Sequence, residues 1–521
     1  MRFKATDVYD YYKPSECARR VALKARGEPQ QETDTPFLEL LRNLGDGHEK
    51  AHLATLPGVV VLETKDPSER ERLTLQAIRD GAASIYQPRL RHVVDLDGEP
   101  LELVGEPDFL LRDPERGQYR IRDSKLARNI DSKRHRGIPV QLQIYGLLYE
   151  RVVGTAPVAL EVHTGRGDIV PIDYVGAEAV LAELRRHRAF RVGDPADYEP
   201  VGLSKCSGCG YEDRCGDEAR ASRDVSLLPA VDQKKARAFH ARGITSIDQI
   251  PPAIDGADHR DMFWQGKKNP RVTDTAARLR RFAEAFLAGK PVVIETPDLP
   301  DPARCVFLDL EGLPPYLDEL EKIYLWGIKD YRGDVPRFLP ALADFGPQGD
   351  RAGWERFLAI AAGLLSATPD LKFIHWGSYE KTAIERYRNL HGDLFLPLPA
   401  GRPTTEGRPT AVGDAVRSTA SSGRGEGVAS RILDRLLDLL TVVRNSIVLP
   451  VPSYGLKTVE KLAGYERKLA DYQGSLAMAR YIEACETDDR AARDGIVNEI
   501  LAYNEEDLEA TNSVLIWMRQ Q

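Results

Sequence analysis

The sequence predicts an α/β fold class with three globular parts, which we place at residues 1–222, 223–292 and 293–521. Two observations lead to this prediction. In both long parts, strand-like segments are followed by segments with the apolar spacing of helices. Between them lies a short stretch with helical spacing only. The length of 521 residues allows two to four domains.

The composition is that of an ordinary globular protein, with 42% hydrophobic and 29% charged residues. No run of 18 apolar residues predicts a membrane span, and the N-terminal segment lacks the apolar core of a signal peptide. Six cysteines are too few for a secreted disulfide scaffold, so we expect a cytoplasmic protein. The net charge of −8 does not favour a generally basic nucleic-acid binder. It is compatible with a nuclease, because metal-binding carboxylates add acidity and a groove can still be locally basic.

In the first part we expect a helix over 37–55, strands over 101–113 and 117–127, and a second helix over 138–153. An Asp113–Pro114 turn separates the two strands. The segment 223–292 has a helix–Gly-Ile–helix form, which is typical of a helix-hairpin-helix-like unit that binds backbone phosphate. Four cations would assist that binding: Lys234, Lys235, Arg237 and Arg242. A small linker domain with a glycine turn is the equal alternative.

In the third part, segments 303–312, 322–331 and 371–380 are expected to be strands, followed by helices to the end of the part. Residues 400–430 are rich in Gly, Ser, Thr, Arg and Pro, and we expect a flexible insert because such a segment buries little apolar surface. The chain contains no G-x4-G-K-[ST] motif, so it carries no visible ATPase motor.

Carboxylates and a lysine gather in the two predicted strands of the first part. Asp108 lies in one strand, and Asp123 lies near the end of the next, two positions before Lys125. In a hairpin these groups can converge, bind a divalent metal and stabilise charge during phosphodiester cleavage. His48 could add a nitrogen ligand from a helix. The alternative is a surface hairpin with ordinary charges and a core histidine.

Gln141 and Tyr145 are four residues apart and therefore share one face of a predicted helix. With the residues above, this ordered set resembles the RecB-type branch of the PD-(D/E)XK nucleases over about residues 1–220. His48 matches the helical histidine, Gly105 and Asp108 match G-x-x-D, Asp123-Ser124-Lys125 matches (D/E)-x-K, and Gln141 and Tyr145 match Q-x3-Y. The resemblance implies that Asp108 and Asp123 bind Mg²⁺ or Mn²⁺ with help from His48. It also implies that Lys125 stabilises charge or orients water, while Gln141 and Tyr145 brace the site and contact substrate.

Four cysteines bracket this set. Cys17 stands alone, and Cys206, Cys209 and Cys215 form a C-x2-C-x5-C run. Thiolates bind iron–sulfur clusters or zinc. The pattern resembles the [4Fe–4S] nucleases, namely the AddB-type helicase–nucleases and the CRISPR-associated adaptation exonucleases, and this resemblance favours an iron–sulfur cluster over zinc. Cys305 and Cys485 fall outside the pattern.

A second acidic set lies in the third part. Asp309 and Glu311 are two apart, so they share one face of a strand, and Tyr503 and Asp507 are one helical turn apart. The set resembles the tyrosine-bearing DEDD exonucleases of the RNase H-like fold, in which four carboxylates hold two metals. Glu380 takes the place of that family's middle aspartate. Asp438 is the other residue that could fill it.

The whole chain resembles a bacterial and archaeal family of RecB-like nucleases in which a RecB-type domain is fused to a YprB-type RNase H-like domain. We therefore expect a metal-dependent DNA nuclease with a [4Fe–4S] cluster and Mg²⁺ or Mn²⁺, acting on single-stranded or end-bearing DNA in repair, recombination or processing. A helicase is the partner that the resemblance suggests. Two alternatives remain: an RNA-directed or 3′–5′ exonuclease centred on the third part, and a non-catalytic DNA-binding subunit of a helicase complex.

Overall fold

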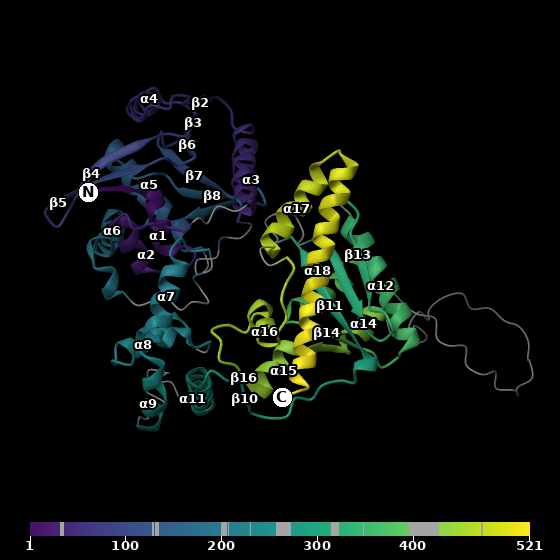
Figure 1. Ribbon diagram of the computed structural model, residues 1–521. Coiled ribbons are helices and arrows are strands. Elements are labelled where there is room, and N and C mark those ends of the chain that lie inside the picture. Colours follow the sequence, from purple (N-terminus) through teal and green to yellow (C-terminus); the bar gives the residue numbers. More distant parts are fainter. Residues whose placement is uncertain are drawn as a thin grey trace, which may run out of the picture. The chain divides into compact units, whose positions relative to one another are not determined.

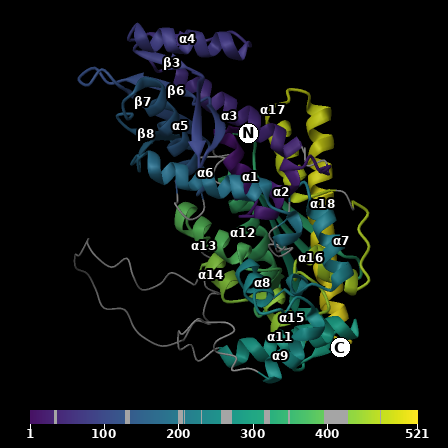
Figure 2. The same cartoon turned by 90° about the vertical axis from the view of Figure 1, so that its left-hand side faces the viewer.

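The computed structural model describes residues 1–31, 36–127, 130, 135–198, 206, 208–229, 231–256, 272–313, 322–346, 349–394, 427–469 and 472–521. Contacts divide the chain into two compact units, and each is described by itself (Figures 1 and 2). The N-terminal unit comprises 1–290 and 449–453, and the C-terminal unit comprises 291–448 and 454–521. The structure thus groups most of 223–292 with the N-terminal unit. The three-part division and its boundaries stay a prediction.

The N-terminal unit contains two sheets. The larger has the strand order β2-β3-β6-β7-β8-β9 and the smaller has the order β1-β5-β4. The strands of the larger sheet are β2 (Val59–Val61), β3 (Ser84–Tyr86), β6 (Phe109–Arg112), β7 (Tyr119–Lys125), β8 (Leu160–Thr164) and β9 (Ile169–Ile172). Those of the smaller sheet are β1 (Arg2–Lys4), β4 (Leu90–Leu96) and β5 (Glu99–Gly105).

Helix α5 (Gly137–Val153) forms the centre of this unit's core because most of its residues are apolar and buried. It packs against strands of both sheets, and its residues Leu142, Leu147 and Leu148 are completely buried. Among the described residues, the helices of this unit are α1 (Tyr9–Tyr12), α2 (Ala18–Ala25), α3 (Pro36–Leu53), α4 (Pro67–Arg79), α5 (Gly137–Val153), α6 (Ala177–Val192), α7 (Glu212–Ser222), α8 (Gln233–His240), α9 (Ile250–Gly256) and α11 (Val272–Ala288).

The prediction of one strand over 101–113 is wrong. The segment forms β5 and β6, which belong to different sheets and are separated at Glu106–Asp108. Pro107 lies at this break, where its missing N–H removes a ladder hydrogen bond. The predicted hairpin itself is present, since β6 pairs antiparallel with β7 and Phe109 lies opposite Arg122.

The C-terminal unit is built on a five-stranded sheet of order β13-β12-β11-β14-β15. The strands are β11 (Cys305–Gly312), β12 (Ile323–Asp330), β13 (Arg337–Leu342), β14 (Lys372–His375) and β15 (Leu436–Asp438), with a separate pair β10 (Val292–Val293) and β16 (Ile447–Val448). The helices are α12 (Gly349–Ala367), α13 (Tyr379–His391), α14 (Val428–Leu433), α15 (Leu439–Ser446), α16 (Leu456–Leu462), α17 (Gly474–Glu486) and α18 (Arg490–Met518).

Helices cover both faces of this sheet, so β12 is buried along its whole length. Leu308 and Leu310 of β11 join a core with α12, whereas the alternate residues of β11 face α18 (Figure 1). The acidic pair of β11 is therefore on the α18 face. Most of the predicted insert 400–430 lies outside the described residues, but Val428–Ser430 begin α14.

The α/β fold class predicted from the sequence is confirmed, with mixed sheets and many helices in both units. No helix among the described residues is both long enough and apolar enough to cross a membrane.

Candidate functional site

The first acidic site lies where β6 begins and β7 ends. The backbone N–H of Asp108 donates to Oδ1 of Asp123 over 3.1 Å, and the backbone N–H of Ser124 donates to Oδ2 of Asp108 over 2.6 Å. The Lys125 ammonium lies 2.7 Å from Oδ2 of Asp123. The hairpin therefore brings the predicted Asp108, Asp123 and Lys125 together.

Burial controls the electrostatics of this site. It raises the pKa of Asp108, and the neighbouring Asp123 raises it further. Burial alone would lower the pKa of Lys125, but the attraction of Asp123 and of other acidic neighbours outweighs it, so the net pKa is raised. A cation near these oxygens would favour the ionised form of Asp108, because it would offset both effects.

A chain of hydrogen bonds supports the site from α5. The Tyr9 hydroxyl donates to Oε1 of Gln141 over 2.9 Å, and Nε2 of Gln141 donates to the Tyr145 hydroxyl over 2.7 Å. The Tyr145 hydroxyl donates to the carbonyl of Glu106 over 3.1 Å, two residues before Asp108. Gln141 and Tyr145 thus lie on one helix face as predicted and fix the backbone beside the carboxylates.

His48 is not brought into the same group. Among the described residues, His48, Asp108 and Asp123 do not have ligand atoms that all lie within 4.8 Å of one another. The His48 ring instead stacks on His163, with ring centres 4.3 Å apart, and His163 stacks on His52 at 3.9 Å. A ligand role for His48 stays a prediction.

Two residues near the carboxylates were not found by sequence reasoning. Tyr9 has its pKa raised to about 12 by burial and by the two aspartates, against the effect of Lys125. Glu49 follows His48 in α3 and contributes to the raised pKa of Asp108, after burial and Asp123. Glu49 could have been found from the sequence, because it directly follows His48, the histidine of the helical motif. Tyr9 is more than 100 residues away from its partners in sequence, and no local pattern marks it.

The four bracketing cysteines line one cavity of the N-terminal unit, between the start of α2 and the segment that leads into α7. Burial, followed by the other thiols, raises the pKa of Cys206 to about 12, and burial raises that of Cys215 to about 11. No three of the four thiols lie within 4.8 Å of one another.

Arg19 and Arg20 line the same cavity. Nε of Arg19, and Nε and Nη1 of Arg20, are buried without a hydrogen-bond partner among the described residues. Buried donors of this kind favour an anionic group in the cavity.

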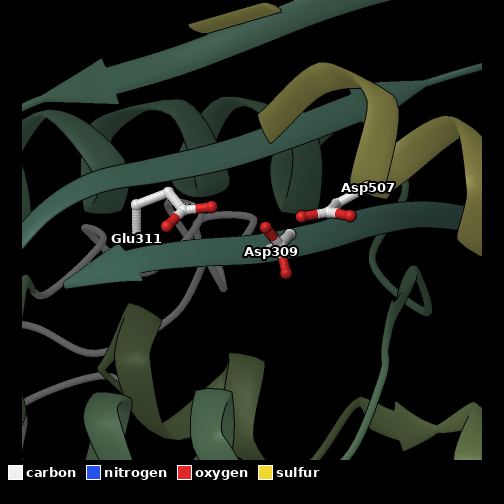
Figure 3. A group of neighbouring side chains, drawn as sticks. All are labelled: Asp309, Glu311 and Asp507. Atoms are coloured by element: carbon white, nitrogen blue, oxygen red, sulfur yellow. The ribbon is translucent and has the colours of Figure 1, made fainter. Parts of the chain in front are cut away.

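The second acidic site joins β11 to α18. The carboxylates of Asp309, Glu311 and Asp507 have ligand atoms that all lie within 4.8 Å, and they face one another in Figure 3. Asp309 and Glu311 lie on one face of β11 because they are two positions apart, and Asp507 comes from α18. Three carboxylates at this spacing, with Glu311 buried and Asp309 half-buried, form a site for a divalent cation.

The carboxylates of this site repel one another in the absence of a cation. Burial, followed by Asp507, raises the pKa of Glu311 to about 8. Burial and then Asp507 and Glu311 raise the pKa of Asp309. The Asn504 side-chain amide donates to Oδ2 of Asp309 over 2.7 Å and fixes its orientation.

The other predicted residues of this site lie nearby, with different partners. Glu380 is 3% exposed and its Oε2 lies 3.1 Å from Nδ1 of the buried His375. Its charge contributes to the raised pKa of Asp309, but Glu380 is not part of the carboxylate group. Asp438 accepts from the backbone N–H of Gly377 over 2.9 Å and caps α15, so its oxygens serve a structural role.

Tyr503 is 5% exposed, and its pKa is raised by burial and by Asp507. A buried arginine that sequence reasoning missed holds Asp507. Nη2 of Arg467 donates to Oδ1 of Asp507 over 2.5 Å, and Nε and Nη2 donate to the two oxygens of Glu460 over 2.7 and 2.8 Å. Arg467 belongs to a segment without a recognisable motif, so only the fold reveals it.

Two protein-family models match the chain. Residues 12–216 match the PD-(D/E)XK nuclease superfamily, and residues 306–519 match the RNase H superfamily. A solved structure titled "Crystal structure of SSO0001" is 16% identical, with a TM-score of 0.23, and the alignment covers 42% of this chain and 86% of that one. No curated protein gave a match.

The matched superfamilies therefore indicate a nuclease-class protein, a phosphodiester hydrolase; domains of these superfamilies typically use divalent metals and act on nucleic acid. More particularly, the chain fuses a PD-(D/E)XK nuclease domain to an RNase H-like domain, which confirms the family arrangement expected from the sequence.

Proposed function

We propose that the protein is a metal-dependent deoxyribonuclease that degrades single-stranded or end-bearing DNA, with the N-terminal unit as its principal catalyst. The contact of Lys125 with Asp123, beside Asp108, carries this proposal. Divalent metal bound at such a site supplies Lewis-acid activation of water and of the scissile phosphate. Asp108 and Asp123 would hold the metal, and Lys125 would stabilise the negative charge that develops on the phosphate.

The hydrogen-bonded chain from Tyr9 to Tyr145 supports this role, because it fixes the backbone just before Asp108. Hydrogen bonds of this type keep a reactive geometry within the narrow tolerance that catalysis requires. Glu49 would add a further negative charge close to the metal position.

The test is cleavage of end-labelled single-stranded DNA and RNA with Mg²⁺ or Mn²⁺. Asp123→Asn should reduce the cleavage rate by at least ~100-fold, because residues that act as a unit fail together. Asp168→Asn is the matched control, since Asp168 is exposed on a turn of the same unit. Wild-type activity in Asp123→Asn would rule out this site, and preferential cleavage of RNA would rule out the proposed substrate.

We also propose that Cys17, Cys206, Cys209 and Cys215 bind a [4Fe–4S] cluster. The shared cavity and the buried donors of Arg19 and Arg20, which have no hydrogen-bond partner among the described residues, support it. Protein purified without oxygen should contain about four irons, absorb near ~400 nm and lose both on Cys206→Ser. Cys485→Ser is the control, because Cys485 is exposed and lies in the other unit. Stoichiometric zinc without iron would contradict the cluster.

The acidic group of the C-terminal unit supports a second activity, 3′–5′ exonucleolytic trimming. A slow metal-dependent trimming should survive in Asp123→Asn and be lost on adding Asp309→Asn. If Asp123→Asn trims no DNA or RNA end and still binds those substrates, this unit is a binding module. A role in repair, recombination or processing with a helicase partner rests on the family resemblance, and pull-down with purified helicases would test it.

A further inference from the structure

A cavity of about 510 Å³ lies in the N-terminal unit next to the first acidic site. Its lining contains a single carboxylate, Glu106, and is otherwise rich in cationic side chains. Five of them contribute: Arg2, Lys4, Lys65, Arg70 and Arg89. Five cations against one carboxylate leave an excess of four positive charges around this cavity, although the whole chain has a net charge of −8.

The protein itself leaves most of this charge uncompensated. Within the described ranges, Arg2, Lys4 and Lys65 have no ion-pair partner, and all three are exposed. Arg70 donates from Nε and Nη2 to the backbone carbonyl of Thr64, over 3.1 and 2.8 Å, and not to a carboxylate. Cations in this state are available to an anionic ligand.

Arg89 marks the inner wall of the cavity. Its residue exposure is only 7%, and one of its terminal nitrogens contacts Glu106. Its Nε is buried and has no hydrogen-bond partner among the residues that the structure describes. Leaving a charged donor buried and unpartnered is costly, so an acceptor supplied by a ligand would be stabilising.

The cavity and the acidic site share a wall. Tyr145 lines the cavity and donates a hydrogen bond to the carbonyl of Glu106. The Glu106 carbonyl stands two positions before Asp108 in the chain, so this tyrosine contacts both the cavity and the backbone that leads into the acidic site. The cavity and the acidic site therefore have Tyr145 and the segment from Glu106 to Asp108 in common.

We propose that this cavity binds the backbone phosphates of a nucleic-acid strand adjacent to the scissile phosphodiester. This proposal rests on the proposed nuclease function and adds how the substrate is held. Guanidinium and ammonium groups bind phosphate oxygens strongly, and strand phosphates follow one another at regular spacing. The strand must then extend beyond the scissile bond on the cavity side, so short oligonucleotides without that extension should be poor substrates.

The test measures binding without cleavage. Full-length protein in EDTA is titrated with a fluorescein-labelled single-stranded oligonucleotide, and Kd is measured by anisotropy over a series of salt concentrations. In the double variant Lys4→Gln/Lys65→Gln, the slope of log Kd against log salt should fall by about 1.4, because each lost phosphate contact removes ~0.7 for single strands. With this change in slope, the Kd of the variant would equal that of wild type at ~1 M salt. At ~0.1 M salt it would be about 25-fold higher than that of wild type.

The matched control is Arg116→Gln/Arg151→Gln, which removes two exposed cations of the same unit that do not line the cavity. Its slope should stay close to wild type. Equal slopes for the cavity variant and the control variant would overturn the proposal. Competition with inorganic phosphate separates the two sources of phosphate. If inorganic phosphate binds to the cavity of the wild-type protein, and the Lys4→Gln/Lys65→Gln protein has the wild-type affinity for the strand, the cavity is a small-anion site and the proposal fails.

Failure of the nuclease function gives a different result. Asp123→Asn should bind the oligonucleotide with the wild-type salt slope, because binding is measured without metal. Loss of cleavage with retained binding would therefore show that the carboxylates are needed for cleavage. A reduced salt slope would show that the cavity binds the strand.

Discussion

The carboxylate group of the C-terminal unit should make the metal-free protein less stable as the pH rises. Burial and Asp507 raise the pKa of Glu311 from 4.5 to about 8. A carboxyl whose pKa is higher in the folded state contributes its full stability below pH 4.5 and loses it as the pH rises through 8. This change corresponds to about 5 kcal/mol, at 1.36 kcal/mol for each pH interval of one.

The C-terminal unit spans more than 200 residues, so 1 kcal/mol shifts its Tm by about 2–4 °C. Because part of the change is already complete at pH 5, about 4 kcal/mol is lost between pH 5 and pH 8.5, and we expect the Tm in EDTA to fall by about 8–15 °C over that range. Intrinsic tryptophan fluorescence follows this unit, because Trp326, Trp354, Trp376 and Trp517 belong to it. Excess Mg²⁺ should restore much of the Tm at pH 8.5 and little at pH 5, because the ion binds the ionised carboxylates.

Glu311→Gln removes the ionisable group and should flatten the dependence of Tm on pH. Glu486→Gln is the matched control, since Glu486 is exposed at the end of α17 in the same unit. The reasoning is refuted if wild type and Glu311→Gln lose the same Tm between pH 5 and pH 8.5, or if the wild-type Tm rises over that range.

Three further substitutions should have defined effects on stability and cleavage. Arg467→Met should destabilise the C-terminal unit by about 3–5 kcal/mol in urea unfolding, because it leaves buried carboxylates without their cation. Gly327→Ala should weaken Mn²⁺ binding measured by electron paramagnetic resonance, because a Cβ there would lie 1.8 Å from Oδ1 of Asn504, which orients Asp309, a predicted metal ligand. Gly105→Ala should cost about 1–3 kcal/mol and slow cleavage, because its Cβ would lie 2.7 Å from the Tyr145 ring.

Each of these substitutions has a control on the same chain. Arg351→Met breaks an exposed ion pair with Glu355 and should cost less than ~0.5 kcal/mol. Gly363→Ala and Gly45→Ala add a Cβ in open space within helices, and each should be neutral or stabilising. Equal effects for a substitution and its control would show that the contacts described here are not the cause.

Local patterns explain which site residues could be found from the sequence. Asp309 and Glu311 share a strand face because they are two apart, and Gln141 and Tyr145 share a helix face because they are four apart. Asp123 and Lys125 follow the same rule in β7 and lie in direct contact. In each case, the secondary structure alone fixes the relation between the side chains.

Relations that depend on tertiary packing could not be predicted in this way. Arg467 reaches Asp507 across 40 positions, and Tyr9 reaches Gln141 across 132. A ligand role of His48 beside the aspartates also depends on long-range geometry and stays a prediction; its ring stacks on His163. The break between β5 and β6 was missed because an apolar alternation continues across a proline that separates two sheets.

The position of Cys17 beside the C-x2-C-x5-C run has a consequence for the order in which the chain can fold during synthesis. The thiol cavity joins residues 17 and 215, so its last wall exists only after nearly the whole nuclease domain has left the ribosome. β1 depends on a later partner too, since it pairs with β5 about a hundred residues further on. The first 30 residues therefore lack their complete packing partners until late in synthesis. The cavity closes only after residue 215 has been made, so a closed cavity means that almost the whole domain is present.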